Sequence, residues 1–319
     1  MGTYIIRRLL TAIPTLIAIS IIIFAILKLA PGDPMAQFAA NPAVPPEVRQ
    51  NIRRQLGLDD PLPVQYSKWA RSWVKGDWGF SFASRISVRQ LIAGRIGTTL
   101  YVLGLAYVVA LLIAIPIGIL SAIKQYSIFD QVATTVAFFG FSIPTFFSGL
   151  LFILLFSIKL GWLPFIYENK GNSPWRFLQW GQFKYALMPI LVLGFFQGAR
   201  LMRYVRASML ENMRLDYVRT ARAKGLRERT VVVTHVLRNA LIPIITIIAL
   251  DLPGIFAGAV VTEQIFRVPG LGSLTISAIQ SSDTPVVMAL TFIFSILVVL
   301  FNLLADVLYG VLDPRIKYS

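Results

Sequence analysis

The stretch Asp216-Tyr-Val-Arg-Thr-Ala-Arg-Ala-Lys-Gly225, followed by His235-Val-Leu-Arg-Asn-Ala-Leu-Ile-Pro243, is the most informative part of this sequence. It is charged and helix-prone, and Gly225 suits the end of a helix because glycine adopts a positive φ without strain. Very apolar segments flank it on both sides. Since charged side chains are expensive inside a bilayer, this pattern indicates a structured polar loop between two membrane spans.

The composition is that of a protein that crosses a membrane several times. Hydrophobic residues make up 56% of the 319 residues and charged residues 14%, and the mean hydropathy is +0.70. A soluble domain carries about 25% charged residues. The net charge of +15 comes from Lys and Arg between the apolar runs, which suits membrane lipid and topology control and argues against a nucleic-acid partner. With no cysteine and one histidine, thiolate and multi-histidine metal sites are excluded.

Six segments are apolar enough to span a membrane, which takes about 20 residues each. They cover residues 9–30, 98–121, 131–158, 186–203, 241–262 and 285–309. The first run is too long for the apolar part of a cleaved signal, so we expect it to be a retained span. The fourth is the weakest, because Arg200 and Arg203 interrupt it. Pro116, Pro144 and Pro253 interrupt the second, third and fifth spans, which predicts kinked helices there.

The basic residues set the expected orientation. Lys and Arg are dense in residues 204–240 and also precede the first span, so the positive-inside rule places both termini in the cytoplasm. Basic residues between 159 and 184 are a counter-signal. Residues 31–97 then lie on the extracytoplasmic side of the membrane. Within them we expect a helix from Pro45 to Gly57, followed by an amphipathic segment whose Trp69 and Trp73 lie against the membrane interface, pack within the protein, or form a platform for a solute-binding protein.

The segment of the opening paragraph resembles the cytoplasmic coupling loop, or EAA loop, of bacterial ABC-importer permeases in the dipeptide/oligopeptide/nickel branch. Arg219-Thr220-Ala221 stands where the general loop has Glu-Ala-Ala, and Gly225 follows at the right spacing. The acidic first position is missing and Pro243 arrives later than the usual proline. Further motifs of that family occur in order: Ala30-Pro-Gly-Asp-Pro34, Leu56-Gly-Leu-Asp-Asp-Pro-Leu-Pro-Val-Gln-Tyr66, Gly76-Asp-Trp-Gly79, Ser142-Ile-Pro-Thr-Phe146, Gly258-Ala-Val-Val-Thr-Glu-Gln-Ile-Phe266, Val268-Pro-Gly-Leu-Gly272, Asn302-Leu-Leu-Ala-Asp306 and Leu312-Asp-Pro-Arg-Ile316.

The resemblance implies one permease domain over residues 1–319, all-α, with six transmembrane helices in the type I ABC-importer permease fold. It implies a "B"-type permease subunit in a bacterial or archaeal inner membrane. The implied partners are a homologous second permease, two ABC ATPase subunits and an extracytoplasmic solute-binding protein. The ATP would be hydrolysed on those separate subunits, because this chain has no phosphate-loop pattern, so it is expected to be no enzyme and to carry no cofactor.

A short peptide is the expected solute, transported by alternating access. Nickel chelates, glutathione and oligosaccharides are alternatives within the same machinery. An ATP-independent channel or a membrane scaffold is the alternative of a different class. A membrane-embedded enzyme is disfavoured, since His235 has no serine or carboxylate motif beside it and no catalytic residue is predicted.

The coupling loop, within residues 204–240, would transmit motion rather than perform chemistry. The small residues Thr220, Ala221 and Ala223 would let a short helix enter a partner's groove, while the surrounding basic residues would suit an acidic partner surface. His235 is expected to position that helix. The complete set of candidate coupling residues is Tyr217, Arg219, Thr220, Ala221, Arg222, Ala223, Lys224, Gly225 and His235.

A carboxylate inside a membrane span is a functional hypothesis by default. Asp251 is therefore a candidate for the translocation pathway, or pairs structurally with an arginine or a backbone donor. Asp306 is expected to bind Arg315 or a helix terminus. Glu263 with Arg267 would either close an outer gate or form an exposed surface pair.

Overall fold

The computed structural model describes residues 2–29, 47, 50, 59–169, 179–257 and 259–312, and helices joined by turns and loops make up these ranges. The only β pairing there is an isolated bridge between Phe80 and Ser87. The longer helices are α1 (Gly2–Leu29), α4 (Leu62–Val74), α5 (Val88–Ile123), α6 (Ile128–Ser142), α8 (Trp180–Met213), α11 (Arg238–Ala257), α13 (Leu271–Gln280) and α14 (Thr284–Leu312). The shorter elements are α7 (Thr145–Phe152), η1 (Ile153–Lys159), α9 (Asp216–Ala223), α10 (Glu228–Thr230), η3 (Val231–Leu237) and α12 (Val260–Ile265), where η marks a π-helix.

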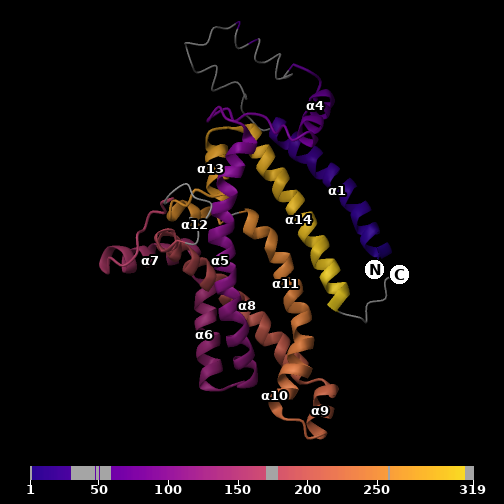
Figure 1. The fold of residues 1–319 in the computed structure, drawn as a ribbon, viewed down its shortest axis with the longest axis vertical. Coiled ribbons are helices and arrows are strands. Elements are labelled where there is room, and N and C mark those ends of the chain that lie inside the picture. The colour runs from indigo at the N-terminus through magenta and orange to yellow at the C-terminus, as the bar shows by residue number, and fades with distance from the viewer. Residues whose placement is uncertain are drawn as a thin grey trace.

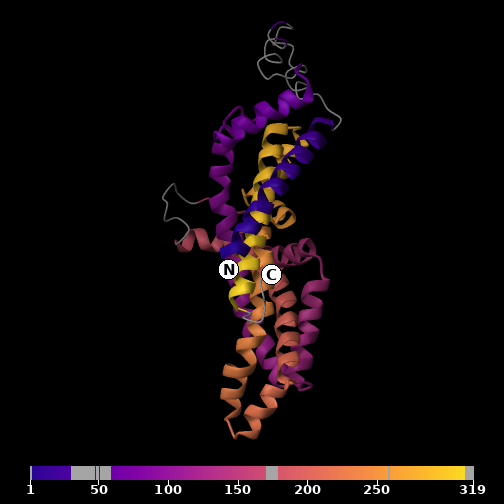
Figure 2. The same ribbon diagram turned by 90° about the vertical axis from the view of Figure 1, so that its right-hand side faces the viewer.

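The molecule is elongated, with α4 and α13 at one end and α9 and α10 at the other (Figure 1). The helix α5 runs along much of this length, and α8 packs against it in the most extensive helix contact of the fold. The N-terminal α1 lies along α14, which in turn contacts α11. Figure 2 shows that the beginning of α1 and the end of α14 lie close together, part-way along the molecule.

Five helices are long and apolar enough to cross a membrane, and the bent pair of α6 with α7 and η1 would make a sixth. The all-α architecture with five to six spans agrees with the predicted fold class. Large apolar side chains such as Leu112 and Phe139 are exposed along these helices, as expected for surfaces that meet lipid. The helix predicted from Pro45 to Gly57 lies outside the described residues, apart from Glu47 and Gln50.

The third predicted span, residues 131–158, is not a straight helix. The chain bends by 100° between α6 and the α7–η1 segment. Pro144 precedes α7, and Ile143 is extended with φ −80° and ψ 125°, because a following proline disfavours the helical conformation at the residue before it. By contrast, Pro116 and Pro253 lie inside α5 and α11, which continue through them.

The aromatic residues of α4 pack within the protein. Trp73 stacks on Trp78 with ring centroids 5.4 Å apart, and its other neighbour is Phe292 of α14, at 4.6 Å. Trp69 contacts the same Phe292 and also Phe24 of α1. These rings fasten α4 to the ends of α1 and α14. Of the three roles considered for Trp69 and Trp73, the structure shows packing within the protein.

Close approach of α5 and α8 depends on glycine. A Cβ added at Gly118 of α5 would lie 2.7 Å from the side chain of Val205 and 3.0 Å from the carbonyl oxygen of Met202. A Cβ added at Gly194 of α8 would lie 2.8 Å from Val109. Small residues at such contacts let helix backbones approach in a membrane, where van der Waals packing drives helix association. The α5–α8 pair is thus the tightly packed centre of the fold.

We predict that Gly118→Ala destabilises the protein by about 1–3 kcal/mol, the usual cost of overpacking a tight contact. Gly104→Ala on the same helix is the control, because a Cβ there would meet nothing within 4 Å and alanine favours the helix by about 0.5–1 kcal/mol. Thermal unfolding midpoints of the purified protein in one detergent would test this. Equal midpoints for the two variants would contradict it.

Candidate functional site

The segment between α8 and α11 forms a short helix with defined ends. Helix α9 begins after Leu215, which is extended, and has Asp216 in its first turn, where a carboxylate is favourable. It ends at Gly225, whose φ is +74°. The N–H of Gly225 donates to the backbone carbonyl of Arg222 at 2.9 Å, and the N–H of Leu226 donates to the backbone carbonyl of Ala221 at 3.4 Å. This pair of bonds is a Schellman motif, which requires the left-handed conformation that glycine adopts freely.

One face of α9 is part of the protein's own core. Val218 and Ala221 are buried in a cluster with Val205 and Met209 of α8. The cluster continues into η3 and α11, through Val231, Val232, Val236, Ala240 and Ile244. The hydroxyl of Tyr217, half-buried, donates to the Asn212 side-chain oxygen at 3.0 Å. Helix α9 is therefore held firmly between the two long helices that it connects.

The other face of α9 is open and basic. Arg219, Thr220, Arg222, Ala223 and Lys224 are all exposed. The sequence grouped Ala221 with Thr220 and Ala223 as small residues for a partner's groove. That grouping is wrong for Ala221, because its side chain points into the core and is 4% exposed. The exposed small residues are Thr220 and Ala223.

A bidentate ion pair links α9 to α10. Arg222 donates to the carboxylate of Glu228 at 3.1 and 2.6 Å. The hydrogen bond from Arg222 holds the pKa of the Glu228 carboxyl below its usual value, and the same bond raises the pKa of Arg222. A second pair, Arg219 with Asp216 at 3.5 Å, is highly exposed and contributes little, as solvated pairs do.

His235, the remaining candidate of this segment, lies in the π-helix η3 and is half-buried. Its carbonyl accepts a hydrogen bond from the Asn239 side chain at 2.9 Å. Wide π turns inside helices are rare and occur frequently at functional sites. The π-helix lies directly between α10 and α11, so it is the joint through which α9 connects to the next span.

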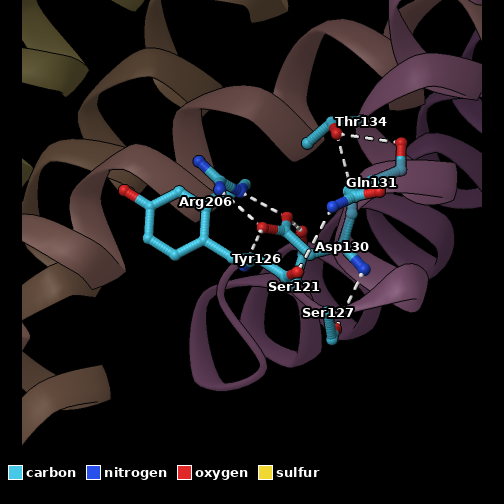
Figure 3. A network of polar contacts seen from close by, with 7 residues as sticks. All are labelled: Ser121, Tyr126, Ser127, Asp130, Gln131, Thr134 and Arg206. Carbon is cyan, nitrogen blue, oxygen red and sulfur yellow. Dashed lines mark hydrogen bonds and ion pairs between the residues drawn. The ribbon is translucent and has the colours of Figure 1, made fainter.

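A buried carboxylate joins three helices near this end of the molecule (Figure 3). Asp130, in the first turn of α6, accepts two bonds from Arg206 of α8, each 2.7 Å long. It also accepts from the Ser121 hydroxyl at the end of α5 and from the backbone N–H of Tyr126 at 2.9 Å. Asp130 is 2% exposed. An ion pair this buried is stable only with such additional bonds, and here they fix the α5–α6 turn to α8.

Sequence reasoning missed Asp130 and Arg206. One signal was available, since Asp130 is the only acidic residue between Asp77 and Glu168. It also follows Ser127 by three residues, and the Ser127 side chain caps α6 by accepting from the Asp130 N–H at 3.3 Å. A lone carboxylate beside a helix-capping serine could have been recognised as a structural anchor.

Asp251, the pathway candidate, lies on α11 and pairs with Arg200 of α8. The guanidinium nitrogen and the carboxylate oxygen are 2.5 Å apart, and the Asp251 side chain is 19% exposed. Asp251 was expected either to line the translocation pathway or to pair with an arginine or a backbone donor, and the structure contains the arginine pair. Nearby, Tyr107 of α5 donates to the carbonyl of Ile248 at 3.3 Å. These contacts tie α11 to both α8 and α5.

The other two carboxylates have partners that the sequence did not predict. Asp306 pairs with Arg8 of α1 at 3.2 Å, and Arg315 lies outside the described residues. Glu263 is 1% exposed and accepts from the Ser273 N–H at 2.7 Å and the Thr99 hydroxyl at 3.4 Å. Because it is buried among these donors, the expectation of an exposed surface pair with Arg267 is wrong.

No group of three or more potential metal ligands occurs in the ranges that the structure describes. The features that stand out are mechanical: a short exposed helix, a π-helical joint, and ion pairs that connect α8 to its neighbours. This arrangement suits the transmission of motion from α9 into α5, α6, α8 and α11.

We predict that Asp130→Asn lowers stability by about 3–5 kcal/mol, the cost of leaving the buried Arg206 without its counter-charge. Asp216→Asn is the control, because the side chain of Asp216 is 95% exposed and its pair with Arg219 is solvated. Thermal unfolding of both variants in the same detergent would measure the difference. Similar midpoints would show that the network in Figure 3 has no stabilising role.

We also predict that the α9–α10 connection weakens in acid. The folded-state pKa of Glu228 lies below its ordinary value. The bond to Arg222 therefore stabilises the fold fully when the pH is above the ordinary pKa of a glutamate. This contribution is lost as the pH falls through the lowered pKa. Hydrogen exchange of residues 216–228 should therefore accelerate, after correction for intrinsic pH effects. Glu228→Gln should abolish this acid-dependent acceleration, whereas the control Glu211→Gln should retain it. If the acceleration persisted in Glu228→Gln, protonation of Glu228 would be excluded as its cause.

The chain is similar to known transport proteins over nearly its whole length. Residues 114–318 match the model of the family described as binding-protein-dependent transport system inner membrane component, and residues 1–103 match the N-terminal model of the corresponding membrane component. The chain is 43% identical over 319 residues to the oligopeptide transport system permease protein AppB of Bacillus subtilis, covering 100% of both chains. It is 40% identical to a putative peptide permease protein of Brucella suis, over 99% of both.

A third relative is the glutathione transport system permease protein GsiC of Escherichia coli K12, which is 38% identical over 100% of both chains. The family match and these identities extend over nearly the whole sequence, and the five to six apolar helices fit a multi-pass protein of the inner membrane. The chain therefore belongs to the inner-membrane components of binding-protein-dependent transport systems, and is a permease of an ABC importer in the peptide/nickel family.

Proposed function

We propose that this permease imports short peptides by alternating access, driven by ATP hydrolysis on two separate ATPase subunits that dock on the outer face of α9 and on its counterpart in a second permease. The observation that carries the proposal is the two-sided construction of α9. Its inner face is buried with residues of α8, η3 and α11, and its outer face is exposed and basic. A push on the outer face is therefore transmitted to both flanking helices.

The proposed orientation places α9 and both termini in the cytoplasm and α4 outside. In Figure 1, α1 begins and α14 ends at their lower ends, toward the end that carries α9. The density of Lys and Arg in residues 204–240 supports the cytoplasmic assignment of that end. The solute-binding protein would then dock at the end of the molecule that carries α4 and α13.

Transmission of the movement would follow the polar links of α8. The Arg206–Asp130 pair would carry movement to the α5–α6 turn, and the Arg200–Asp251 pair would carry it to α11. A substrate ammonium at Asp251 would have to compete with the Arg200 guanidinium. We therefore propose that Asp251 acts chiefly by joining α8 to α11, with contact to the solute as its secondary role.

A peptide is the favoured solute because the similar permeases of B. subtilis and B. suis are named for oligopeptides and peptides. Glutathione, the solute in the name of the E. coli relative, is itself a small peptide. Nickel chelates and oligosaccharides would use the same mechanism with a different binding protein. An ATP-independent channel or scaffold gives no reason for a basic helix exposed beside a rigidly packed joint.

The test uses the complete importer, co-expressed with its second permease and ATPases and reconstituted with its loaded binding protein. We expect uptake of a short peptide against its gradient only when ATP is supplied. Ala223→Glu should remove the ATPases from the purified complex, because it places a bulky acid on the exposed face of α9. Ala93→Glu, at an alanine that is also exposed and lies near the start of α5, should retain them. Uptake without ATP, or ATPases retained by Ala223→Glu, would contradict the proposal.

A further inference from the structure

A cavity of about 540 Å³ lies between α6 and α8. Its charged lining consists of three arginines from one helix, Arg200, Arg203 and Arg206. Residues three apart share a helix face, so α8 presents all three on one side. Thr134 and Phe138 of α6 line the opposite side. The volume is within the range of about 300–1,000 Å³ that small-molecule sites occupy.

Two of the three arginines are neutralised by carboxylates that do not line the cavity. Arg200 pairs with Asp251 and Arg206 with Asp130. Arg203 differs, because no carboxylate of the described residues pairs with it. Its contact is with a ring, the guanidinium carbon lying 4.5 Å from the centroid of Phe141. The cavity lining thus carries a positive charge without a counter-charge.

The placement of Arg203 leaves its charge available to a ligand. A cation over an aromatic face gains about 0.5–2 kcal/mol, but the ring accepts no in-plane hydrogen bonds, so the guanidinium fork can still bind a planar oxyanion with two parallel bonds. The neighbouring apolar ring of Phe138 is 57% exposed. One charged fork beside exposed aromatic surface suits a small organic carboxylate with an apolar side chain.

We propose that this cavity is a solute site of the permease, in which Arg203 binds the C-terminal carboxylate of the transported peptide. This inference rests on the proposed import of peptides. The cavity is formed by α8, which leads directly into α9, and Arg200 connects it to α11. A carboxylate bound at Arg203 would therefore contact the same helix, α8, that leads into the docking face of α9. The neutralised arginines at either side keep the site selective for a single negative charge.

The test compares ATP-driven uptake of a peptide with a free carboxylate and of the same peptide with a C-terminal amide. The importer is reconstituted in liposomes, and the binding protein is saturated with each peptide so that the ratio of the two uptake rates reports on the permease. A hydrogen bond to a charged group is worth about 1.5–3 kcal/mol, so Arg203→Gln should lower the free-acid to amide ratio by about 10- to 150-fold. Arg203→Lys should restore part of it.

Two further variants guard against misfolding and general loss of charge. Ala207→Glu places a carboxylate one helical turn from Arg203 and should lower the same ratio without removing the arginine. Lys124→Gln removes an exposed positive charge at the end of α5, outside the cavity lining, and should leave the ratio unchanged. Size-exclusion chromatography of each complex checks that assembly is intact.

Several outcomes would overturn the site. An unchanged ratio in both Arg203→Gln and Ala207→Glu would show that no carboxylate binds there. An equal fall for both peptides would assign Arg203 a structural role. A fall for both peptides only in liposomes containing anionic phospholipid would identify the bound oxyanion as a lipid phosphate. Loss of ATP dependence in the unsubstituted importer would instead contradict the proposed function on which the site rests.

Discussion

The close contact between α5 and α8 is the constraint on which the rest of the structure depends. At Gly118 and Gly194 the backbones approach so closely that even a Cβ would collide with the neighbouring helix. In a membrane, where apolar side chains gain nothing by leaving lipid, such van der Waals contact is what holds two helices together. Because α8 leads into α9, the fixed α5–α8 pair sets the position of the whole α9 end of the molecule.

Ion pairs then attach α6 and α11 to α8 at defined positions along its length. Arg206 binds Asp130 at the start of α6, and Arg200 binds Asp251 on α11. Such pairs are costly to break in a low-dielectric environment and directional when formed. A helix bundle held by apolar contact alone can slide, whereas these bonds fix the register of α6 and α11 against α8. Movement of α8 is therefore shared by its neighbours.

Much of this architecture follows from the sequence, because hydropathy reports directly on lipid exposure. The apolar runs coincide with α1, α5, α8, α11 and α14, and the polar segment around residues 216–225 forms the short helix α9. A break at Pro144 was predicted, but only as a kink within one span, and the sequence did not indicate a bend as large as 100°. Hydropathy does not distinguish a straight apolar helix from a broken one of the same composition.

The site was less accessible to sequence reasoning, because it depends on which side of a helix faces the core. Ala221 and Ala223 are chemically identical, yet one is buried and the other exposed. The difference arises from long-range packing against Met209 and Val236, which no local pattern encodes. The partner of Asp251 was foreseen only as one alternative, and that of Asp130 not at all, since each ion pair joins residues far apart in the chain.

The two-sided packing of α9 also limits how such a transporter can diverge. In eight residues, Val218 and Ala221 serve the internal core, while Arg219, Thr220 and Ala223 are open to change. Under the proposed docking of the ATPases on α9, descendants of a duplicated gene could acquire a new ATPase by altering those few outward positions, without disturbing the bundle. Replacement of the whole helix would instead disturb the packing of α9 against α8, η3 and α11. A change of ATPase should therefore proceed by point substitution rather than by exchange of the entire helix.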